Sequence, residues 1–203
     1  MTNDPPRLAR TIGIFADLHG EQRALIAALA ACRAQGVGQI ALLGDLFDRI
    51  EQADRCARAL AGWPTIGVWG NHEREIALAA REEATLLPAT ITLLTGLREE
   101  LVVDDVCLTH EAARWGHAAT LARLAARHPD ITAGAAHDTA RITFAGHTHH
   151  RAARDERGPR DIGRGYLTLD PARRYLINPG ALAVGQFAIW GREQGIVRFC
   201  QTE

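Results

Sequence analysis

The chain has 203 residues, a length that fits one domain with a sizeable core. Hydrophobic residues make up 47% of it and charged residues 23%, as in an ordinary globular protein, and the net charge of -1 excludes a strong long-range attraction to nucleic acid or anionic membranes. No apolar run approaches the ~20 residues needed to cross a bilayer, and the N-terminus does not resemble a signal peptide. We therefore expect a single domain, residues 1–203, with no membrane association and no constitutive nucleic-acid binding.

The cysteines indicate a reducing compartment. They are widely spaced and form no Cys-x-x-Cys pair, which favours reduced, mostly buried thiols over disulfides. We expect a cytoplasmic protein, and the sequence leaves homo-oligomerisation open.

The first half of the chain alternates strand-like and helix-like stretches. The predicted strands are 11–16, 39–43 and 65–69, and the predicted helices are 21–35, 51–61 and roughly 73–83. This order predicts βαβ units, hence a parallel sheet with helices packed on it. Active sites in such sheets gather at the carboxyl ends of the strands, which is where Asp17, Asp45 and Asn71 fall.

The second half predicts a second, mixed or antiparallel sheet stacked on the first. A hairpin is expected from 99–103 and 106–109, then a helix over 115–127, then short strands at 142–145, 175–177, 187–190 and 196–200. Residues 151–164 interleave arginines with acidic residues. We interpret them as a solvated loop, with a cover over the substrate as the alternative.

Metal-binding side chains gather in five short clusters. The clusters are Asp17-Leu-His19, Gly44-Asp45-Leu-Phe-Asp48, Gly70-Asn71-His72-Glu73, His110 and Gly146-His147-Thr-His149. Side chains two apart on a strand face the same way, so Asp17 and His19 are expected to reach one metal. The same holds for His147 with His149. A nitrogen and oxygen ligand set without thiolate suits Mn, Fe, Zn, Ni or Co better than Ca or Mg.

These clusters supply enough ligands for two metal ions side by side, a device that cleaves phosphate esters. Asp45 could bridge the two ions, and the ions would generate a hydroxide that attacks phosphorus. His72, which is not needed as a ligand, could protonate the leaving oxygen, and Asp48 could hold that imidazole and favour its protonated form. Each residue alone has a structural alternative, such as a helix cap for Asp17, Asp45 or Asp48 and a structural role for His110.

The clusters resemble the blocks of the calcineurin-like metallophosphoesterase superfamily: D-x-H, G-D-x-x-D, G-N-H-[D/E], a single H, and G-H-x-H. The resemblance extends from Ile12 to about Phe199 and is closest to small bacterial phosphodiesterases, with Asp17-Leu-His19-Gly20 and a late Asn178-Pro179-Gly180. It implies a four-layer αββα sandwich, that is, two mixed sheets flanked by helices. It also implies His72 as the acid, one metal held by Asp17, His19, Asp45 and His149, and a second held by Asp45, Asn71, His110 and His147.

Some positions depart from related patterns. The run Gly44 to Arg49 with Gly70 to Glu73 is also similar to protein serine/threonine phosphatases, which have glycine after Arg49 and arginine before Gly70, where this chain has Ile50 and Trp69. Glu111 replaces a glycine after the lone histidine and could tune or crowd the second metal. Arg49 remains a candidate for binding the substrate phosphate.

The sequence thus predicts a dinuclear metal-dependent phosphoesterase that hydrolyses a small phosphodiester by attack of a metal-bridging hydroxide, with manganese the favoured metal. One alternative is a phosphomonoesterase, or a protein or nucleoside-polyphosphate phosphatase, with the same site. A second alternative is a non-catalytic scaffold on the same fold. The presence of His72 with every metal ligand favours the enzyme.

Overall fold

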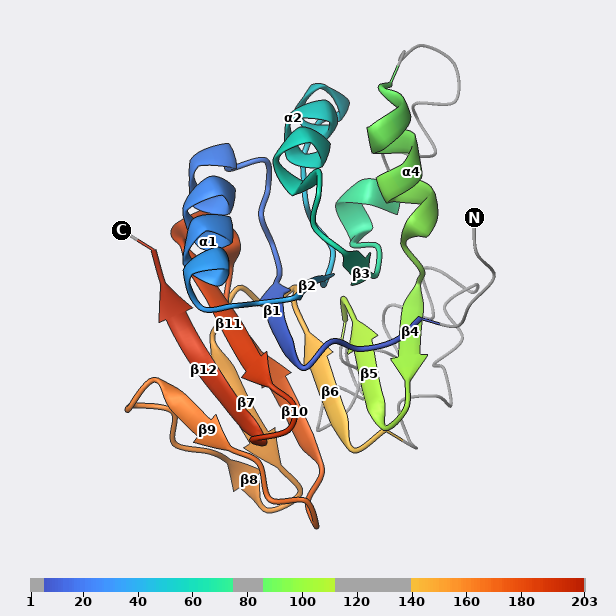
Figure 1. Ribbon diagram of the computed structural model, residues 1–203. Helices are drawn as coiled ribbons and strands as arrows, with labels where there is room; N and C mark the ends of the chain where they lie inside the picture. Colours follow the sequence, from blue (N-terminus) through green and yellow to red (C-terminus); the bar gives the residue numbers. More distant parts are fainter. Residues whose placement is uncertain (1–5, 75–85, 112–139, 203) are drawn as a thin grey trace.

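The computed structural model describes residues 6–74, 86–111 and 140–202, which form two sheets with helices packed on one of them (Figure 1). The first sheet has the order β3-β2-β1-β11-β12-β9. Its strands are β1 Thr11–Phe15, β2 Gln39–Leu42, β3 Thr65–Gly67, β9 Tyr166–Thr168, β11 Gln186–Gly191 and β12 Ile196–Gln201. The β1, β2 and β3 strands pair in parallel, and the remaining pairings are antiparallel, so this sheet is mixed.

The second sheet has the order β4-β5-β6-β10-β7-β8. Its strands are β4 Glu100–Val103, β5 Val106–Thr109, β6 Ile142–Ala145, β7 Ala152–Asp155, β8 Gly158–Pro159 and β10 Tyr175–Asn178. Here β5, β6 and β10 pair in parallel, flanked by antiparallel neighbours. The prediction of two mixed sheets in an α/β fold is confirmed, as is the β4–β5 hairpin.

The helices α1 Gln22–Ala34, α2 Ile50–Leu60 and α4 Pro88–Gly96 lie together beside the first sheet (Figure 1). Successive residues of a strand point to opposite faces of the sheet, so alternate side chains of β1 pack in two different cores. Ile12 and Ile14 of β1 pack toward the second sheet, whereas Phe15 packs in the core that α1 and α2 cover. Gly13 leaves room for this helical layer, since a Cβ there would lie 3.0 Å from the Cys32 sulfur.

The helix predicted from residue 73 begins at the described residues 71–74, and its remainder lies outside the described residues, as does the helix predicted over 115–127. No helix in the described parts of the chain has the length and apolar character to cross a membrane. Cys32 and Cys56 are buried, and burial raises the pKa of each thiol to about 12, so both stay protonated.

Two parts of the fold differ from the sequence-based expectation. The prediction that residues 151–164 form a solvated loop is wrong, because this segment contains β7, β8 and a buried carboxylate. Asp155 is fully buried, where it accepts a hydrogen bond from the Arg173 guanidinium at 2.7 Å. Helix α4 was not expected at all. Its first turn is held by Asp54 of α2, whose Oδ1 accepts hydrogen bonds from the Leu87 N–H at 3.1 Å and the Thr90 hydroxyl at 2.5 Å.

Candidate metal centre

The predicted ligands follow the carboxyl ends of strands from both sheets. Asp17, Asp45 and Asn71 come after β1, β2 and β3. His110 and His147 come after β5 and β6 of the second sheet. The carboxyl ends of parallel strands are the usual place for a site in an open α/β sheet.

An unusual backbone conformation marks these loops. Six described residues other than glycine have a positive φ, and five of them are predicted ligands: Asp17, His19, Asp45, His147 and His149. Left-handed backbone is uncommon for such residues and gathers at functional sites, where the surroundings hold it in place. The paired ligands therefore leave their strands on sharp turns. Asp17 and His19 lie in one group, as expected, but these turns and not strand alternation bring them together.

The first group of ligand atoms joins the loop after β1 to the loop after β6. His19 Nε2 lies 3.1 Å from His149 Nε2, and His149 Nε2 lies 3.7 Å from Asp17 Oδ1. These atoms all lie within 4.8 Å of one another. Burial raises the pKa of Asp17, although the charges of His110 and His149 and the backbone N–H of His147 oppose this rise.

The second group surrounds Asp45. His110 Nε2 lies 3.3 Å from Asp45 Oδ2 and 3.0 Å from Asn71 Oδ1, and His147 Nδ1 lies 3.2 Å from the same His110 nitrogen. The other ring nitrogen of His110, Nδ1, lies 2.7 Å from the Leu43 carbonyl, to which it donates when protonated. Such a bond fixes the tautomer and leaves Nε2 available as a ligand. His147 and His149 thus belong to different groups, contrary to the expectation from their spacing.

The charges in the site favour an ionised Asp45. Burial would raise the pKa of Asp45, but the hydrogen bonds and charges of His110 and His72 lower it to about 2. For His110, burial lowers the pKa, and this is outweighed by the hydrogen bond and charge of Asp45, so the pKa is raised.

The donor set fits divalent cations. Imidazole nitrogens from different loops face one another at 3.1 and 3.2 Å, an arrangement that needs a cation or a proton to relieve the repulsion of their lone pairs. Asp17 Oδ2 is buried and accepts no hydrogen bond from any described residue. Buried carboxylate oxygens are normally satisfied, and a cation would satisfy this one.

Asp48 connects the candidate acid to a candidate ligand. Its Oδ1 lies 2.9 Å from His72 Nδ1 and 2.5 Å from His19 Nδ1. The Nε2 atom of each ring is not bound by Asp48 and lies 4.0 Å from Asp45 Oδ2. The contact with His72 was expected from the sequence, whereas the contact with His19 was not.

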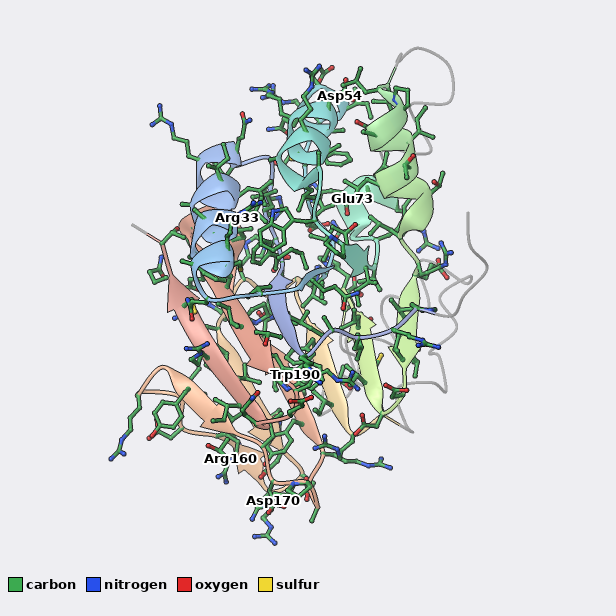
Figure 2. The ribbon with its side chains drawn as sticks, viewed as in Figure 1. Arg33, Asp54, Glu73, Arg160, Asp170 and Trp190 are labelled. Carbon is green, nitrogen blue, oxygen red and sulfur yellow. The ribbon has the colours of Figure 1, made fainter. Side chains whose placement is uncertain are left out.

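Glu73 is a buried residue beside the candidate ligands whose structural role the sequence did not indicate. It is 1% exposed, and Figure 2 shows it between α2 and α4. Its Oε2 accepts hydrogen bonds at 2.8 Å from the N–H groups of Gly70 and Asp45, and its Oε1 accepts one at 2.6 Å from Leu46. Burial raises its pKa, and these backbone donors oppose the rise. Glu73 therefore fastens the loop after β2 to the loop after β3.

Two further candidates lie at the margin of the site. The side chain of Arg49 is exposed, and no hydrogen bond or ion pair within the described residues joins its guanidinium to the ligands. Its backbone N–H is bound by Gln52 at 3.0 Å, so Arg49 contributes to the start of α2. The Glu111 carboxylate lies 4.0 Å from His147 Nε2, the ring nitrogen that does not face His110.

Comparisons with known proteins agree with this geometry. The sequence profile of the calcineurin-like phosphoesterase superfamily domain matches residues 11–192. An uncharacterized protein of Methanocaldococcus jannaschii is 25% identical over 187 residues, which cover 86% of this chain and 76% of the relative.

Two solved structures share the fold. The metallophosphoesterase from Sphaerobacter thermophilus is 24% identical with a TM-score of 0.70, and the match covers 97% of this chain and 89% of the other. A structure described as a novel archaeal phosphodiesterase is 18% identical with a TM-score of 0.53, over 94% and 99% of the two chains. The chain belongs to the calcineurin-like phosphoesterase superfamily, and it is a metal-dependent phosphoesterase whose family uses divalent cations.

Proposed function

We propose that the protein hydrolyses small phosphodiesters with two divalent cations, His72 serving as the general acid. The observation that carries the proposal is the position of His72: Asp48 holds its Nδ1 at 2.9 Å, and its Nε2 faces the ligand groups. When bound, the cations would supply the hydroxide nucleophile and offset charge on the phosphate. The ligands would be Asp17, His19, Asp45 and His149 for one cation, and Asp45, Asn71, His110 and His147 for the other.

The residues of the chain account for the remaining parts of the reaction. An alkoxide is a poorly stabilised leaving group, and protonation by a positioned imidazole speeds its departure. Asp48 keeps the His72 ring oriented, because its Oδ1 lies 2.9 Å from His72 Nδ1. The first group includes one carboxylate and two imidazoles. The positive charge of two divalent cations would exceed the negative charge of Asp17 and Asp45, so the site would keep an excess positive charge that attracts the phosphate anion. Nitrogen and oxygen ligands without thiolate favour manganese, iron, zinc, nickel or cobalt.

The substrate class is tested by comparing bis-p-nitrophenyl phosphate with mono-p-nitrophenyl phosphate. Metal-free protein is supplied in turn with Mn, Ni, Co, Zn or Mg. We expect faster hydrolysis of the diester, with Mn or another borderline metal more effective than Mg. A faster monoester reaction would favour the phosphomonoesterase alternative, and inactivity on both esters with every metal would favour a scaffold.

The acid is tested by His72→Ala against esters with leaving groups of different basicity. A phenolate that leaves easily needs little protonation, so we expect a small loss with p-nitrophenyl esters and a loss of about 10²-fold or more with phenyl or alkyl diesters. His150→Ala is the matched control, because His150 directly follows His149 in the sequence and its side chain is exposed. An equal loss with all leaving groups would remove His72 from the role of acid.

A further inference from the structure

The side chain of Asn178, the last residue of β10, makes three hydrogen bonds although it is only 8% exposed. Its Nδ2 donates to the Gly146 carbonyl at 2.7 Å and to the Thr148 hydroxyl at 3.1 Å. Its Oδ1 accepts from the Gly180 N–H at 2.8 Å. A buried carboxamide with its bonds made in this way restricts every group that it contacts.

The two groups to which Asn178 donates hydrogen bonds belong to the residues directly before and after His147. Both His147 and His149 have left-handed backbone, with φ of 68° and 59°. Such a conformation persists only where neighbouring contacts hold it. The Thr148 hydroxyl also lies 3.4 Å from the His150 N–H, so the bonds of Asn178 reach across the whole turn that carries the two histidines.

The chain that follows Asn178 contacts the other ligand loop. Leu182 N–H donates to the Ala16 carbonyl at 2.8 Å, and Ala183 N–H donates to the Asp17 carbonyl at 3.0 Å. The Asp17 side chain in turn accepts a hydrogen bond from the His147 N–H at 2.9 Å. Residues 178–183 therefore bind the loop of Asp17 and the loop of His147 at the same time.

We propose that Asn178 is a positioning residue that sets the affinity of both metal positions. His149 belongs to the group of Asp17 and His19, and His147 to the group of Asp45 and His110. A turn held by Asn178 therefore supplies one ligand to each group. This proposal rests on the two-cation site proposed above, but it concerns metal binding and not the choice of substrate.

Gln39 offers a matched control. It is 7% exposed, and like Asn178 it uses a buried carboxamide to bind two backbone groups: its Oε1 accepts from Ala9 N–H at 2.9 Å and its Nε2 donates to the Arg7 carbonyl at 3.1 Å. Gln39 begins β2, at the opposite end from Asp45. Its removal should lower stability by a similar mechanism without moving a ligand.

The experiment titrates metal-free wild type, Asn178→Ala and Gln39→Ala with Mn²⁺ by calorimetry, and follows thermal unfolding of the same samples without metal. Loss of an orienting partner of metal ligands typically weakens metal binding about 10- to 100-fold. We expect that increase in Kd for both ions in Asn178→Ala and a wild-type Kd in Gln39→Ala, with a lowered Tm in both variants.

A second pair makes the test independent of how well Asn178→Ala folds. Thr148→Val removes the hydroxyl that Asn178 binds, and Thr148→Ser keeps it, so we expect weaker Mn²⁺ binding in the first and wild-type binding in the second. Wild-type affinity in both Asn178→Ala and Thr148→Val, or equal weakening in Gln39→Ala, would overturn the proposal. Failure of wild type to hydrolyse diesters would leave this result intact, and so would count only against the proposed function.

Discussion

Two glycines allow the loops after β2 and β3 to touch. A Cβ on Gly44 would lie 2.4 Å from the Gly70 nitrogen, and a Cβ on Gly70 would lie 2.0 Å from Asp45 Oδ1 and 2.2 Å from Asp45 N. Real Cβ atoms do not approach so closely, so any side chain at Gly70 displaces Asp45. The carboxylate at the centre of the second ligand group thus depends on a residue with no side chain.

Gly70→Ala is expected to weaken Mn²⁺ binding strongly and to destabilise the fold by about 1–3 kcal/mol, the usual range for an overpacked site. The measurements are calorimetric titration and urea unfolding. Gly96→Ala is the control, because a Cβ at Gly96, the last residue of α4, meets no atom within 4 Å. Wild-type metal affinity in Gly70→Ala would show that the loop after β3 can move without disturbing Asp45.

The candidate ligands could be identified from the sequence, and the structure brings them together, whereas the residues that hold them in place could not be identified. Asp17, His110 and His149 were recognisable because their side chains bind metals and follow predicted strands. Glu73 and Asn178 act on backbone N–H and carbonyl groups, which every residue has, so no pattern of side chains indicates which loop they bind. Their sequence blocks were visible, but their roles required the coordinates.

The same reason explains which elements were predicted. Strands such as β1 and β6 are short apolar runs, and α1 has apolar residues at helical spacing, so the local pattern was sufficient. The start of α4 depends on Asp54, which lies 33 residues before Leu87 in the sequence. The β7–β8 hairpin contains a buried carboxylate, Asp155, which accepts a hydrogen bond from Arg173 of a later segment. Contacts between distant segments decided both elements, and the charged sequence favoured a loop.

The hairpin provides a test by pH. Burial would raise the pKa of Asp155, but the Arg173 hydrogen bond, the Arg157 N–H and the charge of Arg160 lower it below the ordinary value of 3.8. A carboxyl whose folded pKa is depressed stabilises the fold fully above its unfolded pKa and loses that effect as the pH falls through the folded pKa. Asp155→Asn should therefore be less stable than wild type at pH 7, and the difference should shrink below about pH 4.

Urea unfolding of both proteins between pH 7 and pH 3 measures this difference. Asp170→Asn is the comparison, because Asp170 also contacts Arg173, at 3.4 Å, but its side chain is half-exposed. It should cause a smaller loss of stability than Asp155→Asn at pH 7. A gap between Asp155→Asn and wild type that stays constant down to pH 3 would contradict the assignment.

Over the whole molecule, the site connects the two sheets. The first sheet supplies Asp17, Asp45 and Asn71, and the second supplies His110 and His147. The group of Asp17, His19 and His149 and the group of Asp45, His110 and His147 each contain residues from both sheets. A cation bound to either group therefore resists separation of the sheets, in addition to the apolar core between them.

Metal binding should accordingly stabilise the fold. A ligand present at 100 times its Kd that binds only the folded state contributes about 2.7 kcal/mol per site. We expect Mn²⁺ to raise Tm and EDTA to reverse the rise, as followed by circular dichroism. Asp155 lies away from the ligands, so Asp155→Asn should show the same rise in Tm with Mn²⁺, from a lower Tm without metal. An unchanged Tm at saturating Mn²⁺ would mean that the ions bind folded and unfolded chains alike.

At the ligand positions with left-handed backbone, the same substitution would change stability and activity in opposite directions. Glycine adopts positive φ without the strain that aspartate or histidine carries, so glycine at Asp17, His19 or His147 would relax the backbone. It would also delete a metal ligand. A library at these positions selected for thermal resistance without metal should enrich glycine, whereas selection for phosphoester hydrolysis should retain the present residues. At these loop positions, selection for stability and selection for activity would therefore favour different residues.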